Sequence, residues 1–255
     1  MKAMILAAGL GTRLRPLTND RPKALVTVAG KTLLEITIER LRSFGVDQLI
    51  VNAHYFAGMI VDYLNANHNF GIHIEVSREP TLLDTGGGLK NAAHFFLEAG
   101  SEIDEPFFLH NVDVISNIDL AAMLRFHRQH NALATLAVEH RDTSRSLLFD
   151  ERGELCGRRT SLDREPEIVR TSLSAEALGF SGIHVLSPRI FELLKEQGAF
   201  SIIDAYLRLA GAGENVLAFQ AGGCYWRDLG RPENVVQAEQ DAAGNAGETH
   251  RRNLV

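Results

Sequence analysis

The sequence predicts an α/β fold built on a largely parallel sheet. Short apolar runs alternate with amphipathic stretches from the first residues onward, which is the pattern of repeated strand and helix units. The strand-like runs of the first half are short, apolar and followed by turn or helix signals. A glycine-rich turn directly follows the first of them, at residues 7–11.

The composition is that of an average globular protein. The chain has 255 residues, of which 45% are hydrophobic and 23% charged, and this excludes a disordered or fibrous protein. We expect one domain over residues 1–241, since α/β folds commonly reach about 250 residues as one unit. Residues 242–255 are rich in glycine and charge and poor in apolar side chains, so we expect a flexible tail.

Charge and cysteine content exclude several classes of partner. The net charge is −6 and no stretch is rich in Lys and Arg, so we expect no nucleic acid partner. The N-terminus lacks a signal-peptide pattern and no apolar stretch is long enough to span a bilayer, so we expect no membrane and a cytoplasmic location. Cys156 and Cys224 lie far apart, which argues against a disulfide framework and a zinc ribbon.

The first half of the chain contains the clearest elements. Leu34, Ile38 and Leu41 share one helical face, and Gly45 is a suitable helix stop. We expect strands at residues 3–7, 48–53, 72–76 and 106–110, and helices at residues 32–44, 59–67 and 89–97.

The pattern of the second half is less regular. We expect a hairpin around Arg152 and Gly153, formed by residues 147–149 and 154–156. Residues 161–177 are polar and lack a period, so we expect a surface loop or flap. The remaining expected strands lie at 133–138, 180–186, 216–219 and 224–226, and the helices at 120–130, from 188, at 202–209 and from 232 to about 241.

The glycine-rich turn belongs to a longer motif, LAAGLGTRLRPLT at residues 6–18, followed by RPK at 21–23. A glycine loop that leaves a parallel strand lets backbone N–H groups approach an anion, and cationic side chains can neutralise phosphate oxygens. The motif therefore suits a nucleoside triphosphate (NTP). A dinucleotide-binding motif would need glycine at position 14, which is Leu14. A Walker A loop would need glycine at position 25, which is Leu25. The alternative is that Gly9 and Gly11 only make a tight turn.

The motif resembles that of the sugar-1-phosphate nucleotidylyltransferases. Further landmarks follow in that family's order at VNAHY 51–55, TGGG 85–88, NVD 111–113, FSGI 180–183 and WRDLGRPE 226–233. The triple glycine and FSGI look most like the branch of N-acetylmuramate 1-phosphate uridylyltransferases, with heptose 1-phosphate guanylyltransferases also close. The resemblance implies a Rossmann-like nucleotidyltransferase fold of GT-A type, a three-layer α/β/α sandwich around a mixed, mainly parallel sheet.

The resemblance also implies a reaction, in which a sugar 1-phosphate oxygen attacks the α-phosphorus of an NTP and pyrophosphate leaves. UTP is the favoured NTP and Mg²⁺ the implied cofactor, held by Asp113 and Asp228. Arg13 would hold the leaving phosphates, and Lys23 the α-phosphate. The implied nucleotide-binding residues are Ala8, Gly9, Gly11, Thr12, Arg13, Lys23, Gly86 and Gly87.

The sugar side departs from the family pattern. The resemblance implies that Asn111 and Gly182 contact the sugar, but the family's E-K-P string is absent. Arg159 or Arg158 could replace its lysine, and we assign Arg159 to the substrate. Val112 stands where many relatives have glycine. The triple glycine, which we expect to precede a helix, could be a turn only or a surface for the base.

Two other classes of function compete with this interpretation. A glycosyltransferase that uses nucleotide sugars would share the architecture, but it should carry a D-x-D motif, and Asp113 is followed by Val114 and Ile115. A regulatory subunit that only binds nucleotide sugars is permitted by the unusual string at 110–113. The joint presence of Arg13, Lys23, Asp113 and Asp228 argues against it.

Overall fold

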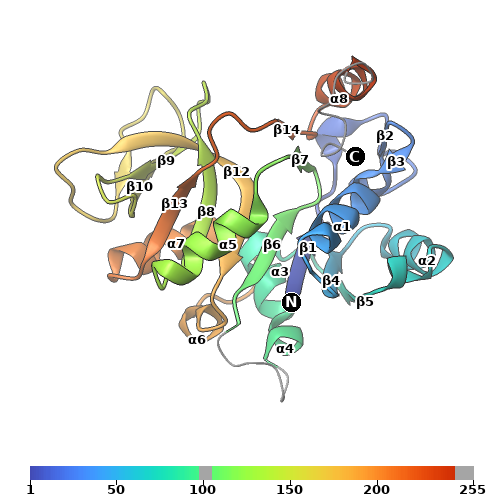
Figure 1. The fold of residues 1–255 in the computed structure, drawn as a ribbon, viewed down its shortest axis with the longest axis horizontal. Helices are drawn as coiled ribbons and strands as arrows, with labels where there is room; N and C mark the ends of the chain where they lie inside the picture. Colours follow the sequence, from blue (N-terminus) through green and yellow to red (C-terminus); the bar gives the residue numbers. More distant parts are fainter. Residues whose placement is uncertain (98–104, 245–255) are drawn as a thin grey trace. The chain divides into compact units, whose positions relative to one another are not determined.

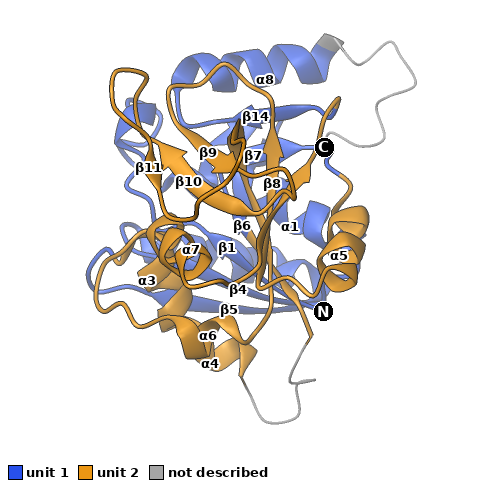
Figure 2. Cartoon of the chain, turned by 90° about the vertical axis from the view of Figure 1, so that its left-hand side faces the viewer, with its two compact units in different colours: residues 1–82, 110–118, 224–255 blue, residues 83–109, 119–223 orange. Residues whose placement is uncertain are grey.

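A computed structural model describes residues 1–97 and 105–244, and they form two compact units (Figure 2). Unit 1 consists of residues 1–82, 110–118 and the chain from 224 onward. Unit 2 consists of residues 83–109 and 119–223. Each unit thus combines segments that are distant in the sequence.

Three adjacent strands of unit 1 pair in parallel, namely β1 (Lys2–Leu6), β4 (Gln48–Ala53) and β5 (His73–Arg78). β4 lies between the other two, and Met4 pairs with Ile50 in the register (Figure 1). The strands expected at 3–7, 48–53 and 72–76 are confirmed to within two residues. The carboxyl ends of these strands meet at one edge, where the glycine-rich turn begins.

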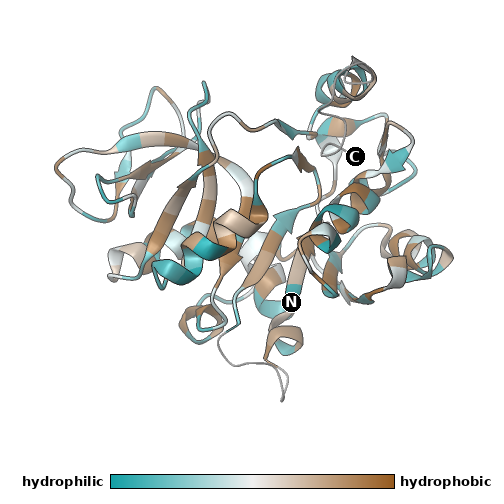
Figure 3. Ribbon diagram, in the orientation of Figure 1, coloured by the Kyte–Doolittle hydropathy of each residue, from teal (hydrophilic) through white to brown (hydrophobic). Residues whose placement is uncertain are grey.

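Helix α1 (Leu33–Ser43) begins and ends at residues suited to helix termini. The Thr32 hydroxyl accepts the N–H of Glu35 at 3.1 Å, which caps the helix, and Gly45 follows its end with φ 84°. Figure 3 shows the mixture of hydrophobic and hydrophilic residues along α1 that underlies its amphipathic pattern. α2 (Ala57–Ala66) follows β4.

Several short elements of unit 1 were not predicted from the sequence. They are the hairpin β2 (Thr27–Val28) and β3 (Lys31–Thr32), strand β7 (Val114–Ser116), and the 3-10 turns η1 (Thr12–Leu14), η2 (Lys23–Leu25) and η3 (His68–Gly71). β7 pairs antiparallel with β14 (Trp226–Asp228), which lies beside it in Figure 1. A run of two or three residues carries too little pattern to be recognised as a strand.

α8 (Pro232–Gly244) begins at proline as expected and continues three residues beyond Asp241. The remainder of the expected tail, residues 245–255, lies outside the described residues. The expectation of a single domain over 1–241 stays a prediction beside the two compact units. No helix in the described ranges is long and apolar enough to cross a membrane.

Unit 2 is organised around the long strand β12 (Glu176–Leu186), which pairs antiparallel with β8 (Ala134–Glu139) and with β9 (Ser146–Phe149). β13 (Val216–Gln220) pairs parallel with β8, and β10 (Leu155–Arg159) completes the expected hairpin with β9. β6 (Phe107–Asn111) runs from unit 2 into unit 1. The helices are α3 (Asp84–Asn91), α4 (Ala93–Phe96), α5 (Leu120–Gln129), α6 (Ile190–Leu193) and α7 (Ile202–Gly211).

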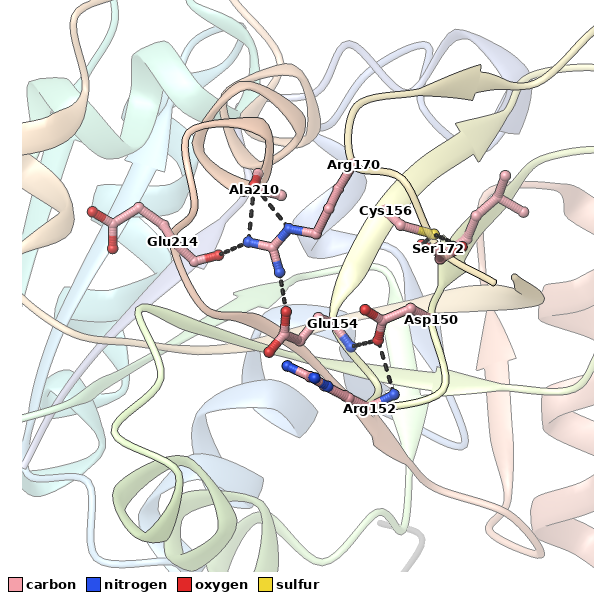
Figure 4. A network of polar contacts seen from close by, with 9 residues as sticks. Asp150, Arg152, Glu154, Cys156, Arg170, Ser172, Ala210 and Glu214 are labelled. Carbon is pink, nitrogen blue, oxygen red and sulfur yellow. Dashed lines mark hydrogen bonds and ion pairs between the residues drawn. The ribbon is translucent and has the colours of Figure 1, made fainter. Parts of the chain in front are cut away.

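The expected surface loop at 161–177 is more ordered than its composition indicates. Strand β11 (Glu167–Ile168) pairs with β10, and Arg170 anchors the next residues (Figure 4). The Arg170 guanidinium forms an ion pair with Glu154 and donates to the carbonyl oxygens of Ala210 at 2.9 Å and Glu214 at 3.2 Å. This arginine therefore satisfies carbonyl groups at the C-terminal end of α7, which a sequence pattern cannot reveal.

Candidate active site

The glycine-rich turn of unit 1 follows β1 directly and is held in a defined conformation. Gly11 has φ 63°, and a Cβ there would lie 3.0 Å from Cγ2 of Thr18 and 3.3 Å from Cβ of Lys23. The Thr18 hydroxyl donates to the Gly11 carbonyl at 2.8 Å. Glycine is thus required at position 11 both by the backbone and by space. Gly9 is exposed, and nothing in the described part of the chain lies within 4 Å of a Cβ placed there.

A buried polar pair at the end of β4 supports this turn. Oδ1 of Asn52 accepts the N–H of Ala7 at 2.7 Å, and its Nδ2 donates to Oε1 of Glu79 at 2.7 Å. Asn52 is 2% exposed and Glu79 4%. The two hydrogen bonds of Asn52 therefore orient the strand end from which the loop departs. Asn52 lies in one of the matching strings, but the contact between Asn52 and Glu79 was not predicted.

Lys23 and Asp113 form an ion pair in unit 1. Lys23 opens η2 behind Pro22, and Asp113 stands between β6 and β7. Their side chains are only 11% and 17% exposed. Lys23 is therefore a largely buried charge and not a solvated loop residue.

The pairing of β7 with β14 brings Asp228 beside Asp113. Asp228 is the register partner of Val114, and the N–H of Leu229 donates to the Asp113 carbonyl at 2.7 Å. Oδ1 of Asp228 accepts the N–H of Gly230 at 2.8 Å. Two acidic residues separated by more than one hundred positions in sequence thus occupy adjacent register positions of the paired strands.

Arg13 and Asp228 both lie beside Gly230. A Cβ at Gly230 would lie 2.6 Å from Oδ1 of Asp228 and 3.2 Å from Nη2 of Arg13, so the missing side chain leaves room for both groups. Arg13 is exposed, as is Thr12, while Ala8 is buried at the start of the turn. Arg13, Lys23, Asp113 and Asp228, four residues assigned from the sequence, are therefore neighbours in one unit.

The two carboxylates fit a hard divalent cation. No group of three or more metal-ligating side chains occurs in the described residues. Mg²⁺ is commonly held by one or two carboxylates, with water and substrate phosphates completing an octahedron. Asp113 and Asp228 supply two carboxylates, and Arg13, an exposed residue with no ion pair to any described residue, can meet phosphate. The donor set is thus suited to Mg²⁺ bound together with a nucleotide.

The string at 110–113 is buried more than its polarity indicates. His110 is 1% exposed, and burial lowers its pKa to about 4, so the imidazole is neutral at physiological pH. The Val112 N–H donates to the Leu6 carbonyl at 3.2 Å, which fixes the chain beside the glycine turn. Asn111 ends β6 and is partly exposed.

The triple glycine lies inside α3 rather than before a helix, which corrects the expected boundary at residue 89. A Cβ at Gly86 would overlap the Phe200 ring, and one at Gly87 would lie 2.5 Å from the Gly198 carbonyl oxygen. The Gly86 N–H donates to the Phe200 carbonyl at 2.9 Å. These glycines therefore permit close packing of α3 in unit 2, and base contact at Gly86 and Gly87 stays a prediction.

The expected sugar residues of unit 2 lie on β12 and β10, and β9 lies between these two strands. Gly182 has φ 75° and sits in an irregular stretch of β12, where the register with β8 shifts. Arg158 pairs with Glu167 at 2.7 Å and with Asp204, whereas Arg159 forms no ion pair with a residue in the described ranges. The assignment of Arg159 to the substrate stays a prediction.

Residues 2–245 match the family model described as nucleotidyl transferase, and the chain belongs to this family. It is 34% identical over 246 residues to the N-acetylmuramate alpha-1-phosphate uridylyltransferase of Caulobacter vibrioides, with 93% of this chain and 95% of that one covered. It is 31% identical to mannose-1-phosphate guanylyltransferase 1 of Arabidopsis thaliana, with 92% of this chain but only 63% of that relative covered.

Solved structures agree with the family. HddC from Yersinia pseudotuberculosis in complex with GMP-PN has a TM-score of 0.74 at 25% identity, over 94% of this chain and 98% of that one. A UDP-glucose pyrophosphorylase complexed with UDP-glucose shares the fold, with a TM-score of 0.75 at 18% identity and coverage of 96% and 98%. The predicted Rossmann-like fold is confirmed, and so is the predicted enzyme class of sugar-1-phosphate nucleotidylyltransferases.

Proposed function

We propose that the chain transfers a nucleoside monophosphate from an NTP, with preference for UTP, to a sugar 1-phosphate, and releases pyrophosphate. The observation that carries this proposal is the cluster of Arg13, Lys23, Asp113 and Asp228 beside the glycine turn of unit 1. Two cationic side chains and two carboxylates beside the glycine turn are the groups needed to bind a triphosphate together with a metal ion.

Each residue of the cluster has a proposed task. Arg13 holds the β- and γ-phosphates, since its exposed guanidinium can bind two oxygens at once. Lys23 stabilises the negative charge on the α-phosphate. The turn residues Ala8, Gly9, Gly11 and Thr12 contact the nucleotide. Asp113 and Asp228 hold Mg²⁺, which would neutralise charge on phosphate oxygens when bound.

Substrate recognition is proposed for residues outside that cluster. Gly86 and Gly87 contact the base, and Asn111, Gly182 and Arg159 contact the sugar phosphate. The preference for UTP is supported by likeness to the uridylyltransferase of Caulobacter, while the guanylyltransferase of Arabidopsis makes GTP the principal competitor. We also propose a cytoplasmic location, because nucleoside triphosphates are the substrates.

The test is pyrophosphate release from each of the four NTPs with Mg²⁺ and a panel of sugar 1-phosphates. We expect turnover with UTP and at least one sugar 1-phosphate, and loss of most turnover in Arg13→Met. Arg15→Met is the matched control, because Arg15 is also exposed and follows η1 directly. No pyrophosphate from any pair would contradict the proposal and favour a subunit that only binds nucleotide sugars.

A further inference from the structure

β14, the strand that carries Asp228, receives little support from its own sheet. β14 and β7 form a two-stranded sheet in which each strand has three residues. A two-stranded pair of this kind is only marginally stable in water. A carboxylate that binds a metal ion has to be held to within about 0.5 Å of its working position. Contacts from another element are therefore needed to fix β14.

Helix α8 of unit 1 contacts this strand at two points. Nδ2 of Asn234 donates to the Asp228 carbonyl oxygen at 2.7 Å. Oδ2 of Asp241 accepts from Nη2 of Arg227 at 2.7 Å and from its Nε at 3.1 Å. α8 lies next to β14 in Figure 1. The helix thus holds both the residue assigned to the metal and the residue that precedes it.

The spacing along α8 suits this attachment. Asn234 and Asp241 are two helical turns apart, so they share one face and are separated by about 10 Å along the axis. Ala238 lies between them on that face and is 3% exposed. The Asp241 carboxylate is itself oriented, because it accepts the Gln237 amide at 3.0 Å and the Tyr225 hydroxyl at 2.8 Å. Both contact points are therefore fixed by the helix.

The ion pair between Arg227 and Asp241 also sets the charge beside Asp228. The two side chains of this pair are 26% and 22% exposed, so they are partly shielded from water. Without Asp241, an uncompensated positive charge would lie one residue from Asp228. Such a charge repels a cation bound to that carboxylate. Asp241 thus favours a cation at Asp228 by charge as well as by geometry.

We infer that Asn234 and Asp241 are positioning residues for the metal carboxylate. They act through the Asp228 carbonyl and through Arg227, and they keep β14 in the register that places Asp228 beside Asp113. The inference rests on the proposed function for the assignment of Asp228 to the metal. It gives α8, a helix without an assigned site residue, a part in metal binding.

The test uses Asn234→Ala and Asp241→Asn, each with a matched control on the same helix. Gln240→Ala also removes an amide and Glu239→Gln also removes a negative charge, in both cases at an exposed position. Mn²⁺, which suits the same oxygen ligands as Mg²⁺, is titrated into each protein, and the loss of its free EPR signal reports binding. We expect Kd for Mn²⁺ to rise about 3- to 10-fold in the first two variants and to stay unchanged in the controls.

Steady-state rates give a second measurement. In Asn234→Ala and Asp241→Asn, the Mg²⁺ concentration for half-maximal rate should rise, while kcat at saturating Mg²⁺ stays within about twofold of wild type. A merely structural role would lower the urea concentration for unfolding without changing the affinity for metal. Unchanged Mn²⁺ affinity in either variant would overturn the positioning role of that residue.

Asp228→Asn separates failure of this inference from failure of the proposed function. If Asp228→Asn binds Mn²⁺ as tightly as wild type, the proposed metal site is wrong and the inference fails with it. If Asp228→Asn binds Mn²⁺ weakly while both α8 variants bind it like their controls, the metal site stands and only the role of α8 is overturned.

Discussion

At the scale of single residues, the ion pair between Lys23 and Asp113 joins a proposed phosphate ligand to a proposed metal ligand. The two side chains are 11% and 17% exposed, so each charge depends on the other for much of its stabilisation. The proposed tasks are therefore coupled, because a change at one residue alters the charge that its partner experiences.

Lys23→Met tests this coupling. We expect kcat to fall about 10²- to 10³-fold, because a charge on the α-phosphate is lost. We also expect a loss of about 1–3 kcal/mol in the free energy of unfolding, because Asp113 is left without its partner. Urea unfolding measures the second effect, with Lys31→Met as control, since its ion pair with Glu39 is about one-third exposed. Unchanged kcat and stability would rule out the coupled roles.

Asp113→Asn and Asp228→Asn test the shared metal. Each should abolish most turnover and raise the Mg²⁺ concentration for half-maximal rate, because both carboxylates are assigned to one ion. The double variant should be hardly worse than the poorer single variant, since either change already breaks the site. Additive losses with an unchanged Mg²⁺ requirement would show that the two residues do not share an ion.

At the scale of elements, the glycines of α3 lower its helix propensity but allow it to pack closely against residues 198–202. Glycine weakens a helix, yet α3 begins at Asp84, before all three glycines. The approach of residues 198–202 explains this, because the Phe200 carbonyl accepts the N–H of Gly86 and Thr85 Oγ1 accepts the N–H of Ile202 at 2.9 Å. Tertiary contacts therefore override the local preference.

Gly87→Ala measures this packing. We expect it to lower the free energy of unfolding by about 1–3 kcal/mol, because the new methyl group meets the Gly198 carbonyl, which is backbone and cannot rotate away. Gly58→Ala in α2 is the matched control. With nothing described within 4 Å, it should gain about 0.5–1 kcal/mol from helix propensity alone. Equal effects in urea unfolding would refute the packing role of the α3 glycines.

At the scale of the whole molecule, buried histidine makes folding sensitive to acid. His127 is 1% exposed and contacts the hydroxyls of Thr135 at 2.9 Å and Ser187 at 3.1 Å. Burial lowers its pKa to about 4 from an ordinary value of 6.5. Between these two values the unfolded chain binds a proton that the folded chain does not, so stability is lost as the pH falls from 6.5 to about 4.

The expected loss from His127 over this range is about 3 kcal/mol. Unfolding by urea at several pH values measures it, and His127→Gln should flatten the dependence while retaining a group that can form hydrogen bonds. His130→Gln is the control, because His130 follows the end of the same helix, α5, and its side chain is exposed. A pH dependence that is unaltered in His127→Gln would contradict the assignment.

The sequence by itself determined the features that depend on near neighbours. The strand at 48–53, the helix at 32–44 with its stop at Gly45, and the glycine turn were all predicted, because apolar period, helix stops and turn chemistry involve residues a few positions apart. The string from Leu6 to Lys23 was sufficient for the family. The assigned residues of the cluster could therefore be named before their arrangement was known.

Only the tertiary structure decided which of these residues meet. Lys23 pairs with Asp113 across 90 positions, and Asp228 stands beside Val114 through a strand of three residues that carries no recognisable pattern. Register likewise places Arg158, which pairs with Glu167, and Arg159, which forms no ion pair within the described ranges, on opposite faces of β10. The physical reason is that packing and strand register select partners over long separations, and no local pattern records that selection.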